Sequence, residues 1–179
     1  MRSIKPMKNK VIFVTGGARS GKSDFALRCA EKIGRIRAYI ATAEVLDDEM
    51  KERITNHKRL RGDDWDTIEE PKNLLIAFES LHRTYDVAII DCLTLWVSNL
   101  IKDGLTDDTI LKMTDAFMQL INRLKLSLII VSNEVGMGIV PDNPLARRFR
   151  DIAGKVNQLI ASISDEVYFM VSGISIRIK

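Results

Sequence analysis

The chain has 179 residues, of which 27 are basic and 24 acidic, and its formal net charge is +3. This length predicts a single domain over residues 1–179 with a basic N-terminal extension at 1–10, and the near balance of charge gives no reason to expect a nucleic-acid partner. Cys29 and Cys92 lie in apolar stretches without metal-binding spacing, which predicts reduced thiols in a cytoplasmic protein. The apolar runs are too short to predict a signal peptide or a membrane span.

Five short apolar runs alternate with helical patterns along the chain. The runs predict strands at Val11–Thr15, Arg37–Thr42, Asp86–Asp91, Leu126–Ser132 and Glu166–Val171. The segments between them predict helices near Gly21–Ile33, Asp47–Arg61, Pro71–Leu81, Thr106–Leu124 and Asn143–Ile163. This alternation predicts an α/β fold with a mostly parallel sheet and helices on both faces. Two apolar runs joined at Ser172 and Gly173 predict an antiparallel C-terminal hairpin at one edge.

A phosphate-loop pattern, G-x-x-x-x-G-K-S, joins the first predicted strand to the first predicted helix at residues 16–23. Its glycines allow successive backbone amides to surround a triphosphate, and the helix N-terminus adds a favourable dipole. We expect Lys22 to reach the β- and γ-phosphates and Ser23 to hold Mg²⁺. Arg19 occupies a variable position, for which a solvated side chain is the simplest interpretation. The pattern and its context predict a P-loop NTPase fold.

Two carboxylates follow predicted strands at the edge of the sheet where α/β proteins bind ligands. Asp91 ends the apolar run 87–90 and is expected to provide a second contact to Mg²⁺ beside the phosphate loop. The alternative is an ordinary strand-end carboxylate that caps the next segment. Glu134 lies at the corresponding end of another predicted strand and is a candidate for orienting water or substrate.

One of the two histidines lies among positive charges. Arg53 precedes His57 by one helical turn, and Lys58, Arg59 and Arg61 follow it. These cations disfavour the imidazolium form, so a neutral, nucleophilic ring is expected, and they also attract a triphosphate. The spacing alone is equally typical of a surface histidine on a charged helix.

Five segments taken together carry a family resemblance: GGARSGKS, YIATAEVLDDEM, RITNHKRLRGDDWDTIEE, SNEVGMGIVPDNPLARRFRDIAGKVNQ and DEVYFMVSGISIRIK. They resemble the bifunctional adenosylcobinamide kinase/adenosylcobinamide-phosphate guanylyltransferase family of cobalamin biosynthesis, and the resemblance extends from Val11 to Lys179. The segments NEVGMGIVP, LARRFRDIAGKVNQ and the histidine region are more diagnostic than the phosphate loop, which many families share. The chain departs from the common pattern at Gly62, where proline is frequent, and at Asn56, where some members have a second histidine.

The resemblance implies a transferase with two activities. ATP or GTP phosphorylates adenosylcobinamide, and GMP is then transferred from GTP to that phosphate through a covalent guanylyl-histidine, which gives adenosylcobinamide-GDP and pyrophosphate. His57 would be the nucleophile, Lys22 would serve both reactions, and the protein would be a homo-oligomer. The implied nucleotide contacts are Gly16, Gly17, Ala18, Arg19, Ser20, Gly21, Lys22, Ser23, Ala41, Thr42, Ala43, Lys58, Arg59, Leu60, Arg61, Glu69 and Asp91.

Two other functions remain compatible with the residues themselves. The first is a different P-loop kinase of small molecules, in which His57 has no chemical role. The second is a nucleotide-dependent switch that hydrolyses slowly and signals to a partner protein. Only the guanylyltransferase would retain a label from the α-phosphate of GTP on the chain.

Overall fold

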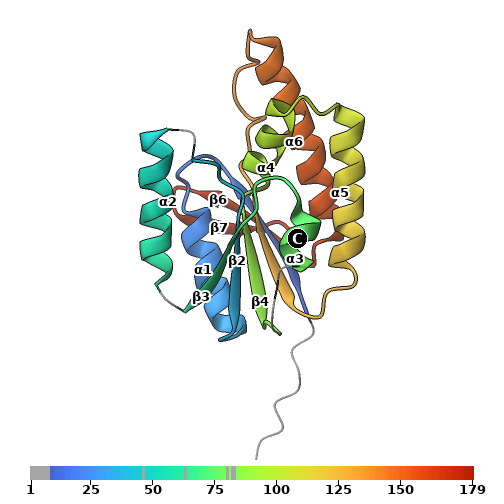
Figure 1. Cartoon of the computed structure of the whole chain (residues 1–179). Helices are drawn as coiled ribbons and strands as arrows, with labels where there is room; N and C mark the ends of the chain where they lie inside the picture. Colours follow the sequence, from blue (N-terminus) through green and yellow to red (C-terminus); the bar gives the residue numbers. More distant parts are fainter. Residues whose placement is uncertain (1–8, 46, 63, 80, 82–83) are drawn as a thin grey trace, which may run out of the picture.

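In a computed structural model the chain folds around a seven-stranded sheet (Figure 1). The structure describes residues 9–45, 47–62, 64–79, 81 and 84–179, with only the backbone of Glu49, Arg53, His57 and Leu60. The strand order is β3-β2-β4-β5-β1-β6-β7; β6 and β7 pair antiparallel and the other neighbouring pairs are parallel. The strands are β1 (Val11–Gly16), β2 (Arg37–Ala41), β3 (Trp65–Glu69), β4 (Val87–Asp91), β5 (Ser127–Val131), β6 (Glu166–Val171) and β7 (Ile174–Arg177).

Helices cover both faces of the sheet, as the alternating pattern predicts (Figure 1). Alternate strand residues point to opposite faces, so Val14 packs in the apolar cluster around α1 while Phe13 packs in the cluster on the other face. The helices of the first face are α1 (Lys22–Ile33) and, beside it, α2 (Asp48–Arg61); those of the second are α3 (Leu74–Glu79), α4 (Leu93–Lys102), α5 (Asp107–Ile121) and α6 (Pro144–Ile163). None of the helices in the described part of the chain combines the length and apolar character that crossing a membrane requires.

Two elements are absent from the sequence prediction. Strand β3 pairs only with β2 at the edge of the sheet, and its residues alternate between more and less exposed positions, so it does not form an apolar run. Helix α4 has the opposite character, because seven of its ten residues are buried. Its exposed residues, Ser98 and Lys102, lie on one side, but a helix of only ten residues gives too short a pattern to separate it from other buried segments.

The C-terminal hairpin has the predicted position and turn. Strands β6 and β7 pair antiparallel, and the turn between them is Ser172-Gly173, with φ angles of 50° and 83°. Positive φ at both central residues is typical of a tight hairpin turn. The amide of Gly173 donates a hydrogen bond of 3.0 Å to the carbonyl of Ser20, so the hairpin supports the phosphate loop directly.

Both cysteines are free thiols, Cys92 buried and Cys29 half-buried. Burial raises the pKa of both, and that of Cys92 to about 11. Thiols with raised pKa values stay protonated and react slowly near neutral pH. We therefore assign neither cysteine a chemical role.

Candidate nucleotide-binding site

A cavity of about 580 Å³ lies between the phosphate loop and α2. Its walls include residues 18–24, the ends of β2 and β4, Asn133 beyond β5 and one side of α2. The carboxyl ends of parallel strands meet at this edge, which is where open α/β sheets bind ligands. The cavity therefore joins the two segments that the sequence singles out, the phosphate loop and the histidine helix.

The phosphate loop presents its lysine and the start of α1 to this cavity. Lys22 is only 7% exposed, and its Nζ donates to the carbonyl of Gly17 at 2.6 Å and to Ser20 Oγ at 3.5 Å. Burial lowers the pKa of Lys22, and the nearby Cys92 and Asp91 side chains offset part of that effect. No side chain caps the N-terminus of α1 at Gly21. An anion bound there would receive the amides that a capping side chain otherwise takes.

Three oxygen atoms meet beside the loop. Asp91 at the end of β4 accepts hydrogen bonds at one oxygen, Oδ2, from Ser23 Oγ at 2.9 Å and from the hydroxyl of Tyr39 at 2.5 Å. Burial and the adjacent Asp91 carboxylate raise the pKa of Tyr39 well above its ordinary value, which keeps its hydroxyl protonated as a donor. A hydroxyl and a carboxylate oxygen at this separation have the chemistry and spacing of two ligands of a single Mg²⁺ ion.

The rest of such a coordination shell must come from outside the protein. The described part of the chain contains no cluster of three or more His, Cys, Asp or Glu side chains able to hold a metal ion. Mg²⁺ is often held by one or two protein oxygens together with water and substrate phosphates. Ser23 and Asp91 fit that pattern.

Helix α2 forms the opposite wall of the cavity. It begins after Asp47, whose side chain accepts from the amide of Met50, and it contributes Met50, Ile54, Asn56, Lys58 and Arg61 to the cavity wall. The backbone of His57 lies one turn after Ile54 and one turn before Arg61. The side chains of His57 and Leu60 fall outside the described residues, so the roles predicted for them remain predictions.

Arg61, the last residue of α2, is the most deeply placed cation of this wall. It is 8% exposed, and its guanidinium carbon lies 3.7 Å from the centroid of the Tyr39 ring. Its Nη2 donates to Thr67 Oγ1 at 3.5 Å, while its buried Nε has no hydrogen-bond partner among the described residues. Stacking on an aromatic face compensates part of the cost of burying a cation.

The predicted contacts from the strand ends divide into two groups. Ala41 and Ala43 line the cavity, whereas Thr42 between them is fully buried and does not. The Thr42 hydroxyl donates to the carbonyl of Cys92 and accepts from its amide, both at 2.8 Å. Thr42 therefore joins β2 to the start of α4 rather than facing a ligand.

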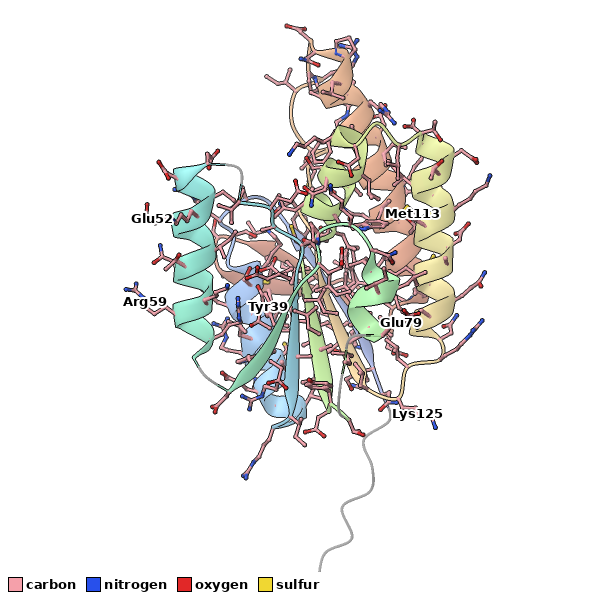
Figure 2. The ribbon with its side chains drawn as sticks, in the orientation of Figure 1. Tyr39, Glu52, Arg59, Glu79, Met113 and Lys125 are labelled. Carbon is pink, nitrogen blue, oxygen red and sulfur yellow. The ribbon has the colours of Figure 1, made fainter. Side chains whose placement is uncertain are left out.

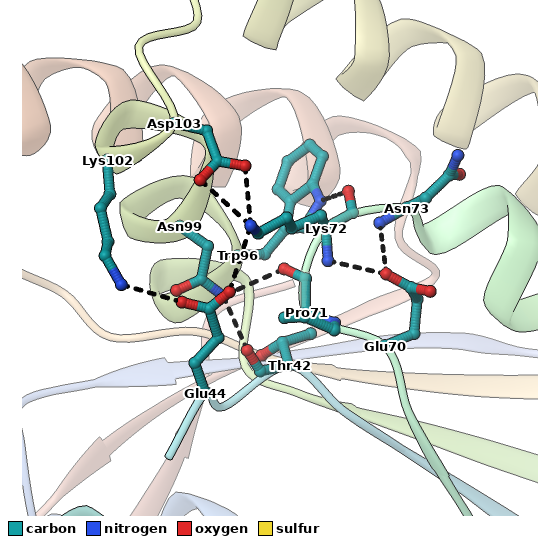
Figure 3. A network of polar contacts seen from close by, with 10 residues as sticks. All are labelled: Thr42, Glu44, Glu70, Pro71, Lys72, Asn73, Trp96, Asn99, Lys102 and Asp103. Atoms are coloured by element: carbon teal, nitrogen blue, oxygen red, sulfur yellow. Dashed lines mark hydrogen bonds and ion pairs between the residues drawn. The ribbon is translucent and has the colours of Figure 1, made fainter. Parts of the chain in front are cut away.

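A polar network extends from Thr42 over the neighbouring loops (Figure 3). The buried Asn99 of α4 donates to the carbonyl of Thr42 at 2.8 Å and to that of Pro71 at 3.0 Å. Lys72 forms ion pairs with Glu44 at 3.3 Å and Asp103 at 2.8 Å. These contacts hold the segments that follow β2 and β3 against α4, and so fix one rim of the site.

Several other predicted residues lie away from the cavity wall. Arg59 is exposed, and Glu69 forms an exposed ion pair with Lys58. The carboxylate of Glu134 accepts the amide of Gly136, so it closes a local turn. Its neighbour Asn133 is the residue beyond β5 that reaches the cavity.

Sequence reasoning missed Tyr39 and Asn133 as site residues. For Tyr39 a general rule gives a signal, since a tyrosine inside an apolar strand must find a partner for its hydroxyl. The strand order places β2 next to β4, with Ala41 opposite Asp91 in register. That neighbour relation, which the sequence does not state, brings Tyr39 to Asp91.

The fold and the site together define a protein of the P-loop nucleotide-binding class. Two of the solved structures that share the fold are ATPases. An ATPase domain aligns with a TM-score of 0.51 at 10% identity, covering 90% of this chain and 69% of its own. An ATPase from the type III secretion system of pathogenic bacteria aligns with a TM-score of 0.54 at 12% identity, covering 94% of this chain and 56% of its own.

Within this class the chain belongs to the family described as cobinamide kinase / cobinamide phosphate guanyltransferase, a family of enzymes that matches residues 12–178. The bifunctional adenosylcobalamin biosynthesis proteins CobU of Escherichia coli (strain K12) and of Salmonella typhimurium (strain LT2) are each 41% identical to it, covering 94% of this chain and 99% of their own length. The protein CobP of Pseudomonas aeruginosa is 40% identical, covering 93% of this chain and 95% of its own.

Proposed function

We propose that this chain phosphorylates adenosylcobinamide with ATP or GTP and then transfers GMP from GTP to that phosphate, in the cytoplasm. The observation that carries the proposal is one cavity bordered by both the phosphate loop and the helix that bears His57. Membership of the family and the word "bifunctional" in the names of near-full-length relatives support it. One site would hold the same triphosphate for attack at two different phosphorus atoms.

The kinase step needs positioning and charge stabilisation more than a nucleophilic side chain. The substrate hydroxyl oxygen attacks the γ-phosphorus, the bond from that phosphorus to the β,γ-bridging oxygen breaks, and the hydroxyl proton passes to solvent. Lys22 and the first amides of α1 stabilise the negative charge of the departing diphosphate. The other phosphate-loop residues, Gly16 to Ser23, supply the enclosing backbone.

Ser23 and Asp91 would hold the Mg²⁺ ion that accompanies the nucleotide, which neutralises phosphate charge when bound. Their 2.9 Å hydrogen bond supports this assignment, because it already brings the two oxygen ligands together. Ala41, Ala43, Lys58 and Arg61, which line the cavity, complete the proposed nucleotide contacts, and Leu60 remains a predicted contact.

The guanylyltransferase step would proceed through His57. An imidazole nitrogen attacks the α-phosphorus of GTP, a P–N bond forms, and the bond to the α,β-bridging oxygen breaks to release pyrophosphate. A phosphate oxygen of the corrinoid then attacks the same phosphorus, the P–N bond breaks, and adenosylcobinamide-GDP forms with the histidine regenerated. The covalent intermediate lets pyrophosphate leave before the second anion binds, so the two do not repel one another.

A homo-oligomer is part of this proposal. Large apolar side chains are exposed on β7, just after it and on the loop after β5, among them Ile139 at 95%, Ile174 at 68% and Ile178 at 63%. Apolar surface of this kind supports association with further copies of the chain.

The proposal is tested by supplying adenosylcobinamide with ATP and GTP separately and identifying the products by mass. We expect adenosylcobinamide phosphate with either nucleotide and adenosylcobinamide-GDP only when GTP is present. A phosphate product without the GDP product would indicate a kinase alone. Failure to modify the corrinoid at all would contradict the proposal.

A further inference from the structure

Tyr39 lies between the two walls of the cavity and contacts both. It belongs to β2, on the side of the sheet where α2 lies (Figure 2). Its side chain is 3% exposed, with the hydroxyl on Asp91 and the ring against Arg61. The chain thus uses one side chain to reach a carboxylate beside the phosphate loop and a cation at the end of α2.

The polar end of Tyr39 fixes the Asp91 carboxylate. Its hydroxyl donates to Oδ2 at 2.5 Å, and Ser23 donates to the same oxygen at 2.9 Å. Two donors at one oxygen restrict how the carboxylate can rotate. Outer partners that orient a metal-ligating group commonly affect metal affinity about 10–100-fold when they are removed.

The ring of Tyr39 packs against Arg61, the C-terminal residue of α2. The Arg61 guanidinium stacks 3.7 Å from the ring centroid and is otherwise held, among the described residues, by a 3.5 Å contact to Thr67. Arg61 is also the only described side chain of α2 that is buried. Among the described side chains, the Tyr39 ring is therefore the surface against which the one buried residue of this helix packs.

We propose that Tyr39 is a positioning residue with two roles. Its hydroxyl orients the Asp91 carboxylate toward the nucleotide's Mg²⁺ ion, and its ring holds the C-terminal end of α2 in position. This inference rests on the proposed function. Tyr39 itself takes no part in bond making or breaking. It places the metal-side carboxylate and the histidine helix in fixed relation to the same triphosphate.

The two halves of this role are separable by substitution. Tyr39→Phe removes the hydroxyl and keeps the ring, whereas Tyr39→Leu removes both. Tyr168→Phe is a matched control, because the Tyr168 hydroxyl donates to the Glu166 carboxylate at 2.8 Å on the same sheet but away from the cavity. GTP binding is measured by calorimetry over a series of Mg²⁺ concentrations, with thermal unfolding recorded for each variant.

We expect Tyr39→Phe to raise the Mg²⁺ concentration needed for half-maximal GTP binding about tenfold. Tyr168→Phe should leave the Mg²⁺ requirement unchanged. Tyr39→Leu should show the same Mg²⁺ effect and, in addition, slower incorporation of α-labelled GTP into the chain. In an Asp91→Asn background, Tyr39→Phe should have no further effect on the Mg²⁺ requirement.

Equal Mg²⁺ requirements for Tyr39→Phe and Tyr168→Phe would overturn the inference, as would GTP binding by the unchanged chain that does not depend on Mg²⁺. If Tyr39→Phe is too unstable to measure, a Tyr39→Leu or Asp91→Asn chain that keeps the original Mg²⁺ requirement overturns it equally. Failure of the proposed function has a different signature: the unchanged chain would acquire no label from GTP while its Mg²⁺-dependent binding persists.

Discussion

The two walls of the cavity are built by different means. On one side, the phosphate loop continues from a central strand, is supported by the Gly173 amide and contains a lysine that is 7% exposed. On the other side, α2 is rich in charge, and Arg61 is its only buried side chain among those described. A preorganised wall suits the stabilisation of phosphate charge, whereas the position of the histidine helix depends on the stacking of Arg61 on Tyr39 and on a few polar contacts.

The largest effect should follow from removing the cation of the preorganised wall. Lys22→Ala is expected to lower kcat/KM of both reactions by about 10²–10³-fold, because a positioned donor to the developing phosphate charge is lost. Steady-state rates measure the effect. Lys32→Ala is the matched control, since Lys32 is an exposed lysine in the last turn of the same helix. Equal rates for the two variants would count against a shared phosphate loop.

A second substitution tests how tightly the phosphate loop is packed. Gly16 has φ of 147°, and a Cβ at this position would lie 2.4 Å from the carbonyl oxygen of Met170. Gly16→Ala should therefore lower the free energy of unfolding by about 2–3 kcal/mol. Gly17→Ala is the control, because no atom lies within 4 Å of its added Cβ. Denaturant unfolding of the two variants compares them, and equal stabilities would show that the loop is loosely held.

Amide hydrogen exchange compares the two walls in a single experiment. Amides of α2 should exchange faster than those of β1, β4 and β5, by on the order of tenfold or more, because local opening of a helix with few buried contacts costs less free energy. Mass spectrometry of peptides from the native protein measures the difference. Equal protection of α2 and the central strands would contradict the expected difference in local stability between the two walls of the cavity.

The smallest effect should come from the ion pair at the end of α2. Lys58 and Glu69 are 50% and 61% exposed, so their coupling energy in a double-mutant cycle should be about 0.2–1 kcal/mol. The exposed pair of Lys112 and Asp108 on α5 provides a reference of the same kind. Stability measured in denaturant gives both values. A coupling well above that of the reference pair would mean that α2 is anchored more firmly than its exposure indicates.

Much of this architecture follows from the sequence because it depends on local patterns. The phosphate loop, its flanking strand and helix, and the terminal hairpin each have short-range signatures. The sequence does not predict strand β3, because an edge strand is half polar, or α4, because it is a short helix of mostly buried residues. The formation of both elements depends on contacts with parts of the chain that are distant in sequence.

The site residues likewise divide into those with a local sequence signature and those whose role depends on tertiary contacts. Lys22, Ser23 and Asp91 come from motifs, and the structure brings all three to one cavity. Tyr39 begins the family segment YIATAEVLDDEM, but nothing in that segment indicates its role, which arises only when β2 pairs with β4 and Arg61 of α2 stacks on the ring. Thr42, by contrast, matches a family contact segment, yet its groups are used in joining strand to helix.

The most direct test of the account is to locate the guanylyl group on the chain. After incubation with GTP labelled at the α-phosphate and with Mg²⁺, we expect an acid-labile label on the peptide that contains His57. His57→Ala should abolish the label, and His82→Ala, which changes the other histidine, should retain it. A label that persists in the His57→Ala protein would contradict the account.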